Sequence, residues 1–477
     1  MAEANLDVLV RTWERMRADR AQWDTSWQEI ADYLDPVASN ITVQRSPGQK
    51  QTAKLFDSEG VLAPQLLAAS MHGTLTSASQ KWFSLIVRQE EIGKAKDVQD
   101  WLEENADRTY FAFNASNFPS EIHEVYNALT KFATGALFMD EARPTRPGAF
   151  AGFRFKALPI GSYCIDENYD GRVDVLYRQF QISARAAAEQ WGQAIGDHIT
   201  RMADATPERM VTILHAVYPR QGKDRIPGVY VNSSKPYASC YFTTEGQRHK
   251  IAEGGFDEFP FLVPRWSKAA GERYGRGPGH TALPDIKTLN RSVEIFLGAG
   301  AKALDPPLLV LDDGVIGSLS LEPAAWNVVR EMESVAPLES KARFDVSQIM
   351  FERLERKIRR IFFTDQLQLQ EGPNMTATEV TVRYELMQRL LGPTLGRLQS
   401  ELLQPLIERA LAIQARAGVL PPLPQTLAQF GGDIDIEYEG PLARAQRSHD
   451  LIAIERWFSL MQAASTATGS TDVFDNA

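Results

Sequence analysis

Residues 285–304 read DIKTLNRSVEIFLGAGAKAL, and residues 344–363 read FDVSQIMFERLERKIRRIFF. In both stretches apolar side chains recur every three or four residues, which is typical of one face of a helix. The first stripe consists of Ile286, Leu289, Val293, Phe296, Leu297 and Leu304. Pro306 and Pro307 end this helix, and the polar run QLQLQEGPNM follows the second. The two stretches predict a pair of long amphipathic helices.

The segments around these helices predict an insert and a third helix. Residues 305–344 contain short apolar runs separated by turn residues, which indicates a small β-rich insert. A helix of about twenty residues spans about 30 Å, so this insert lies far from the parent domain and suits contact with another copy or another protein. Thr376 and Glu379 fit a capping box, which predicts a long helix that ends near Ala417. Pro393 interrupts its pattern, and we expect a kink there.

Residues 76–265 predict an α+β domain, which is preceded by two helices. Helical periodicity covers residues 6–34, 60–75, 98–114 and 119–132. Short apolar runs bounded by Gly, Pro and Asp predict strands at residues 136–140, 150–158, 173–180, 210–218, 237–242 and 261–266, with a helix at 183–191. Trp13, Trp23 and Trp27 in the first helix favour packing on the body of the same subunit. The surface of a neighbouring subunit is the alternative.

Composition excludes several classes of protein. The 477 residues include 51 Lys plus Arg against 61 Asp plus Glu, a formal net charge of -10. This balance argues against a protein that mainly grips nucleic acid through its phosphates. It suits a surface that DNA slides past and touches only at a few positions. No apolar run approaches the roughly 20 residues of a membrane span, and the N-terminal stretch lacks the apolar run of a secretory signal. We expect no membrane partner.

No catalytic constellation with a meaningful spacing occurs in the sequence. Cys164 and Cys240 are far apart and lack metal-ligand spacing, so we expect reduced thiols and no metal site. Gly275, Gly277 and Gly279 precede a helix but match neither the dinucleotide nor the nucleoside triphosphate motif. We interpret them as a turn that leads from the sheet into the first long helix. The sequence therefore predicts no cofactor and no enzyme, and a nuclease or ATPase with an unrecognised site is disfavoured.

Five segments, in this order, resemble the portal proteins, or head-to-tail connectors, of short-tailed double-stranded DNA bacteriophages. They are WERMRADRAQWDTSWQEIADYLDP from Trp13, LLAASMHGTLTSASQKWF from Leu66, FPFLVPRWSKAAGERYGRGPGHTALPDIKTLN from Phe259, NMTATEVTVRYELMQRLLGPTLGRLQSELLQPLIERA from Asn374 and PLARAQR from Pro441.

The resemblance implies an α+β, predominantly helical portal fold with wing, stem, clip and crown. Portals assemble as a ring with a central channel, usually a dodecamer. The implied division is wing 1–280, stem helix 281–304, clip 305–344, second stem helix 345–363, tunnel loop 364–376, long kinked wing helix 377–418 and crown 419–477.

The resemblance also implies positions along the DNA channel, on the second stem helix and the tunnel loop. They are Arg353, Arg356, Lys357, Arg360, Gln366, Gln368, Gln370, Glu371 and Asn374. The amides suit weak, exchangeable contacts with a moving phosphate backbone, although a merely solvated loop is the plainer interpretation. The four basic residues either repeat as belts around a ring or pair with Glu352 and Glu355 of the same or a neighbouring helix. Implied clip contacts with terminase or adaptor are Asp312, Asp313, Glu322, Trp326 and Arg330.

The implied function is that of a ring-shaped DNA channel at one capsid vertex. Such a ring docks terminase for genome packaging, retains the DNA, joins head to tail and passes DNA out during ejection. The implied partners are further copies of the chain, duplex DNA, the terminase large subunit, a tail adaptor, and capsid and scaffolding proteins. The implied location is the portal vertex of the virion and, during assembly, the host cytoplasm. The alternative is a virion scaffold or adaptor that binds proteins only.

Overall fold

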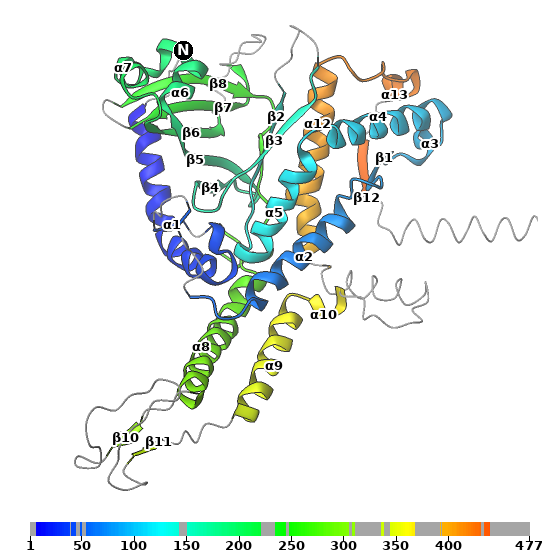
Figure 1. Cartoon of the computed structure of the whole chain (residues 1–477). Coiled ribbons are helices and arrows are strands. Elements are labelled where there is room, and N and C mark those ends of the chain that lie inside the picture. The colour runs from blue at the N-terminus through cyan, green and yellow to red at the C-terminus, as the bar shows by residue number, and fades with distance from the viewer. Residues whose placement is uncertain are drawn as a thin grey trace, which may run out of the picture.

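The computed structural model describes residues 6–38, 40–43, 48–49, 54–142, 150–220, 234–244, 248–304, 308–310, 335–337, 344–367, 392, 394–430 and 434–438. Figure 1 shows a main body of helices and sheets from which two helices, α8 (Pro278–Leu304) and α9 (Phe344–Ile361), project together. Mixed helix and strand content confirms the predicted α+β class.

The long helices of the main body follow the predicted ranges closely. They are α1 (Leu6–Leu34), α2 (Glu59–Leu75), α4 (Lys96–Asn114) and α5 (Phe118–Phe132). Shorter helical elements are η1 (Pro36–Ala38), α3 (Glu90–Gly93), α6 (Ala184–Trp191), η2 (Gly192–Ile195), α7 (Asp197–Ala205) and α13 (Gln425–Phe430). Trp27 is fully buried, and its ring meets Tyr274 edge-on at 4.9 Å. This contact confirms that α1 packs on its own subunit.

The largest sheet is antiparallel, with strand order β4-β5-β6-β7-β8. Its strands are β4 (Tyr163–Glu167), β5 (Val173–Ser183), β6 (Met210–Pro219), β7 (Tyr237–Thr243) and β8 (His249–Phe256). Side chains alternate between its faces, so Leu214 and Ala216 pack with α1. Val211 and Ile213 pack on the other face, with α6 and α7. Three of these elements, β4, β8 and α7, were not predicted from the sequence.

Two smaller sheets complete the body. One has the order β3-β2-β9 and comprises β2 (Leu137–Glu141), β3 (Phe153–Ala157) and β9 (Phe261–Leu262). The other pairs β1 (Phe83–Val87) with β12 (Ile434–Tyr438), so the predicted C-terminal strand returns to the N-terminal part of the chain. Phe113, Phe118 and Phe155 lie at the centre of the main core, with Phe113 and Phe118 stacked at 5.0 Å.

Beyond the ends of the two projecting helices, β10 (Leu308–Val310) pairs antiparallel with β11 (Val335–Pro337). The β character predicted for this insert is thus present in its described residues. The long third helix is described from residue 394 onward and includes a π-helical turn (Gln399–Leu403) followed by α12 (Gln404–Arg416). Pro405 lacks an N–H group for the carbonyl of Glu401, which a wider turn accommodates. The predicted kink at Pro393 and the capping box lie outside the described residues.

The glycine-rich turn before α8 allows two backbones to touch. A Cβ atom at Gly275 would overlap the carbonyl oxygen of Ala133, and one at Gly279 would overlap that of Lys131. Ala133 ends α5 with a φ of 60°, and its carbonyl accepts a hydrogen bond from the N–H of Trp266 at 2.9 Å. The interpretation as a turn into the first long helix is confirmed.

His280, in the first turn of α8, is half-buried, and both of its ring nitrogens are buried. Its ring lies edge-on to Trp23 at 6.1 Å, and neither ring nitrogen has a hydrogen-bond partner among the described residues. Burial lowers the pKa of His280 to about 4; Arg276 lowers it further and Glu272 opposes the change. The folded protein therefore holds this ring neutral at a pH where an unfolded chain binds a proton.

We predict that Gly279→Ala destabilises the protein by about 3 kcal/mol or more, because the added methyl group collides with a backbone carbonyl that cannot rotate away. The matched control is Gly298→Ala in the same helix, where nothing lies within 4 Å of the added atom. This control should raise stability by up to about 1 kcal/mol. Urea titration of both variants measures the difference, and equal effects would contradict the close contact.

We also predict that His280→Phe reduces the pH dependence of stability. In the wild-type protein the unfolded chain binds a proton at His280 between about pH 6.5 and pH 4, whereas the folded chain does not. Stability is thus lost as the pH falls through this window, by up to about 3 kcal/mol. The phenylalanine variant should lack this component in urea titrations at about pH 7 and about pH 5. Parallel losses in both proteins would refute the assignment.

Candidate functional site on the projecting hairpin

Helices α8 and α9 lie side by side, and their apolar stripes meet near the body (Figure 1). Ile286, Leu289 and Ile358 are fully buried. Farther out, Phe296 meets Phe351 edge-on at 5.4 Å. Beyond this pair the predicted stripe is exposed: Leu297 is 54% and Leu304 90% accessible. The helix pair therefore covers only the inner half of its apolar surface.

Two polar side chains fasten the hairpin to the body. Asn290 of α8 is 2% exposed, and its Oδ1 accepts hydrogen bonds from the backbone N–H groups of Phe56 at 2.7 Å and Asp57 at 3.1 Å. Arg359 of α9 donates twice to the carboxylate of Glu59, at 2.9 Å each, and this bonding raises the pKa of the guanidinium. Neither role was predicted from the sequence. For Asn290, the presence of a single amide within an apolar stripe was the one feature that could have indicated a buried hydrogen bond.

The four basic residues predicted for the channel share one side of α9. Arg353, Arg356, Lys357 and Arg360 are exposed and spaced by three or four residues, and we call them the basic stripe. The ammonium group of Lys357 forms an ion pair with Asp285 of α8 at 2.7 Å. Nε of Arg356 donates to the backbone carbonyl of Glu352 at 3.2 Å.

The basic stripe forms no salt bridge with the nearby glutamates of α9 among the described residues. Glu355 pairs instead with Arg359, at 3.5 Å. Among the described residues no salt bridge joins the basic stripe to Glu352 or Glu355. The described residues therefore show no pairing of these four residues with Glu352 or Glu355 of the same helix, whereas pairing with Glu352 and Glu355 of a neighbouring helix stays a prediction.

The predicted loop begins with ordered structure. Phe363 has a φ of 57° at the end of α9, and Oγ1 of Thr364 donates to the carbonyl of Arg359 at 3.0 Å. A short helix, α10 (Thr364–Leu367), follows and packs against α2. Gln366 lies in α10. The other predicted channel and clip residues lie outside the described residues: Gln368, Gln370, Glu371, Asn374, Asp312, Asp313, Glu322, Trp326 and Arg330.

A buried arginine joins the approach to α8 to the long third helix. Arg265 is 1% exposed, and its Nη2 donates to Oε1 of Glu401, in the π-helical turn, at 2.6 Å. Its Nε donates to Oε2 of the same carboxylate at 3.1 Å, and its Nη1 donates to Glu167. These bonds raise the pKa of the Arg265 guanidinium against the opposing effect of burial. A buried charge destabilises the fold unless it is paired, so the carboxylates of Glu401 and Glu167 are needed beside Arg265.

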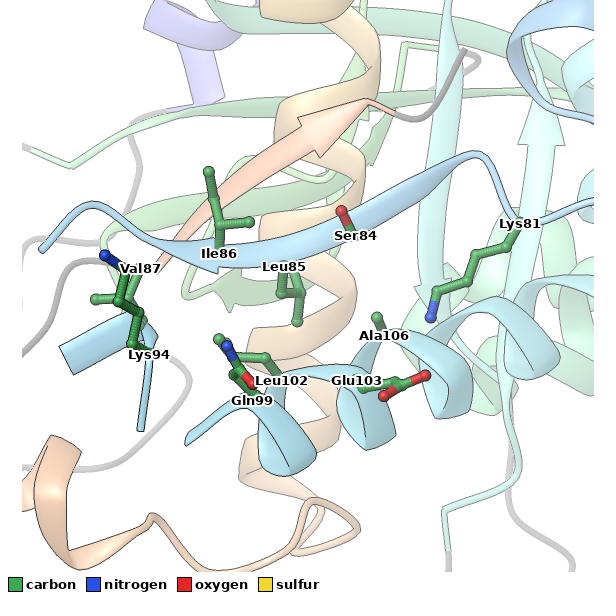
Figure 2. A pocket seen from close by; sticks show the side chains of 11 residues that line it. Lys81, Ser84, Leu85, Ile86, Val87, Lys94, Gln99, Leu102, Glu103 and Ala106 are labelled. Carbon is green, nitrogen blue, oxygen red and sulfur yellow. The ribbon is translucent and has the colours of Figure 1, made fainter. Parts of the chain in front are cut away.

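A groove of about 420 Å³ lies between β1 and α4, away from the hairpin (Figure 2). Leu85 of β1 and Leu102 of α4 lie on its opposite walls, and Lys81 at its edge pairs with Asp107 at 2.6 Å. The groove therefore has apolar walls, and the one lysine named at its edge is paired with an aspartate.

The described residues also bear on metals, thiols and membranes. They contain no group of three His, Cys, Asp or Glu side chains that could hold a metal ion. Cys164 and Cys240 are free and buried, as predicted for reduced thiols, and burial raises the pKa of each to about 11. None of the described helices is both long and apolar enough to span a bilayer.

Comparison with known proteins relates the whole chain to phage connectors. It is 30% identical over 464 residues to a probable portal protein of Bordetella phage BPP-1, across 94% of this chain and 81% of that protein. It is 27% identical over 470 residues to the portal protein of Salmonella phage epsilon15, with 96% and 82% covered. It is 21% identical over 481 residues to the portal protein of Escherichia phage T7, with 97% and 83% covered.

A structure described as the neck of an empty GTA particle contains a chain that aligns with 89% of this one. The match covers 94% of that chain at 13% identity and a TM-score of 0.37. The family model for "Bacteriophage head to tail connecting protein" matches residues 7–477. The chain therefore belongs to the bacteriophage head-to-tail connecting protein family, and it acts as a connector between a phage head and its tail.

Proposed function

We propose that this connector is a portal subunit, and that its copies form a ring around a DNA channel at one capsid vertex. The observation that carries this proposal is the uncovered apolar surface on the outer half of the hairpin. Ile295, Leu297 and Ile349 are 57%, 54% and 66% exposed on helices that project away from the body. Exposed apolar patches of this kind mark contact sites, and a neighbouring hairpin in a closed ring covers them.

In this ring the basic stripe of α9 faces the channel. Arg353 and Arg360 make no salt bridge with any described residue, and both are exposed. Their repetition around a ring gives local contacts with phosphates, while the net charge of -10 keeps most of the surface unattractive to DNA. DNA then passes without being held tightly, as packaging and ejection require.

The remaining portal roles follow the division of the chain. The strand pair of β10 and β11 lies at the far end of the hairpin, where a clip would dock terminase and later a tail adaptor (Figure 1). Residues 1–280 supply the wing. Residues 419–477 supply the crown, whose described part is attached to the body through β12 and through Trp101, which donates to the carbonyl of Pro421 at 3.2 Å. Contacts with capsid and scaffolding proteins, and residence in the host cytoplasm during assembly, complete the proposal.

Replacing apolar residues of the outer hairpin with charge should prevent ring formation. We expect the variant Leu297→Glu with Ile349→Glu to lower the ring fraction by about tenfold or more, because a buried unpaired carboxylate costs several kcal/mol. Tyr169→Glu, at a fully exposed turn of the body, is the control and should assemble normally. Mass photometry and negative-stain electron microscopy measure the fraction. Normal rings from the double variant would rule out the hairpin as the contact.

Neutralising the basic stripe should leave assembly intact and weaken the hold on DNA. Exposed charge contacts contribute about 0.2–1 kcal/mol each, and a ring repeats them. We therefore expect Arg353→Gln with Arg360→Gln to lower the DNA retained in particles by about threefold or more. The control, Arg185→Gln with Arg201→Gln, removes two exposed arginines from α6 and α7. Quantifying the genome in purified particles separates a DNA channel from an adaptor that binds only proteins, for which DNA content stays unchanged.

A further inference from the structure

A second cavity, of about 600 Å³, lies between the two larger sheets and beside α6. Its walls carry an unusual mixture of charged and aromatic side chains. They come from β2, β3, β5, β7 and α6 and include Phe138, Arg154, Lys156, Arg178, Phe180 and Tyr241. The cavity is distant in sequence from the projecting hairpin and plays no part in the role proposed above.

Arg178 is the most constrained of these side chains, at 8% exposed. Its guanidinium carbon lies 4.9 Å from the centre of the Phe138 ring and 5.3 Å from that of Phe180. Its Nε donates to Nδ1 of the fully buried His215 at 3.0 Å. Burial, assisted by the nearby guanidinium, holds the pKa of His215 well below its ordinary value, so this acceptor is neutral.

These contacts fix the guanidinium without a salt bridge to a described residue. Burial lowers the pKa of Arg178, and Tyr241 and Asp140 oppose this change. Arg178 forms a further hydrogen bond with the Tyr241 hydroxyl, and no salt bridge joins it to a described residue. A guanidinium has five N–H donors, more than these two bonds use. Arg178 lines the cavity, and none of its nitrogens is both buried and without a hydrogen-bond partner.

Two further cations approach the same space. Arg154 and Lys156 lie two residues apart on β3, so both side chains project from the same face of the strand. Partial desolvation, followed by the charges of Arg178 and Arg154, lowers the pKa of Lys156, although its side chain remains exposed. Neither side chain forms a salt bridge within the described part of the chain.

The acidic residues of the cavity are partly engaged elsewhere. Glu189 pairs with Arg185 at 3.1 Å, and Oδ1 of Asp140 accepts the N–H of Glu141 at 2.9 Å. Burial also raises the pKa of the Asp140 carboxyl. Three cations therefore line the cavity, and no salt bridge joins them to a carboxylate within the described residues. Asp140, which lies opposite Arg154 in the register of β2 and β3, and Glu141 contribute negative potential at the wall.

We propose that this cavity binds a ligand with a single carboxylate attached to an apolar or aromatic group. The N–H fork of a guanidinium matches the two oxygens of a carboxylate. The faces of Phe138 and Phe180 accept the apolar part, and the volume lies within the usual range of ligand sites. The wall carboxylates disfavour a doubly charged phosphate. A free organic acid and the C-terminal carboxylate of a peptide share this chemistry.

The test uses the assembled full-length protein and isothermal titration calorimetry. The probes are N-acetyl-phenylalanine, its uncharged amide, inorganic phosphate, and a five-residue peptide ending in phenylalanine with a free carboxylate. We expect N-acetyl-phenylalanine to bind about tenfold or more tighter than its amide and tighter than phosphate. Tighter binding of the peptide than of the amino acid assigns the ligand to a protein segment. Weaker or equal binding assigns it to a small organic acid.

Two variants keep the result interpretable. Arg178→Lys retains the charge but loses the planar fork, and should weaken N-acetyl-phenylalanine by about tenfold. Lys156→Gln, at an exposed strand position where folding is not at risk, should weaken it by about threefold. Lys81→Gln, in the groove beside β1, is the matched control and should bind as the wild type. Equal binding of acid and amide, stronger binding of phosphate, or unchanged affinity in Lys156→Gln would overturn the proposal.

Discussion

The hairpin keeps its direction because the backbone at the start of α8 touches the backbone at the end of α5. Gly275 and Gly279 leave no room for a side chain against the carbonyls of Ala133 and Lys131. Trp266 then closes the contact with a hydrogen bond to Ala133. With the first turn of α8 fixed in this way, the helix must project from the body, and α9 returns beside it. Asn290 and Arg359 hold the pair where it leaves the body.

Much of the fold could be predicted from local apolar periodicity. Contacts between segments that are distant in the sequence could not be predicted in this way. The ranges of α1, α2, α4 and α5 followed from apolar spacing, because each buries one face. Strand β8 was not predicted because Gly254 and Gly255 interrupt its alternation of apolar and polar residues. The link between Arg265 and Glu401 spans 136 residues, and no sequence spacing indicates such a partner.

The candidate site shows the same division. Placement of the basic stripe on one side of α9 followed from its spacing, since residues three and four apart share a helix face. The ion pair of Lys357 with Asp285 did not, because it depends on how closely two helices approach. Similarly, the apolar stripe of α8 was visible in the sequence, but its exposed outer half was not. In the proposed ring, a neighbouring hairpin covers that exposed half.

These features give one physical account of a connector subunit. The close backbone contact of α5 and α8 fixes the direction of the hairpin. In the proposed ring, a neighbouring subunit covers the apolar residues on its outer half, and the basic stripe contacts DNA on an otherwise acidic chain. A cryo-electron microscopy reconstruction of the purified protein tests this account most directly. We predict a closed ring in which the α8–α9 hairpins surround a channel wide enough for duplex DNA, with Arg353 and Arg360 facing it. Separate subunits at every concentration, or hairpins on the outer rim, would contradict the account.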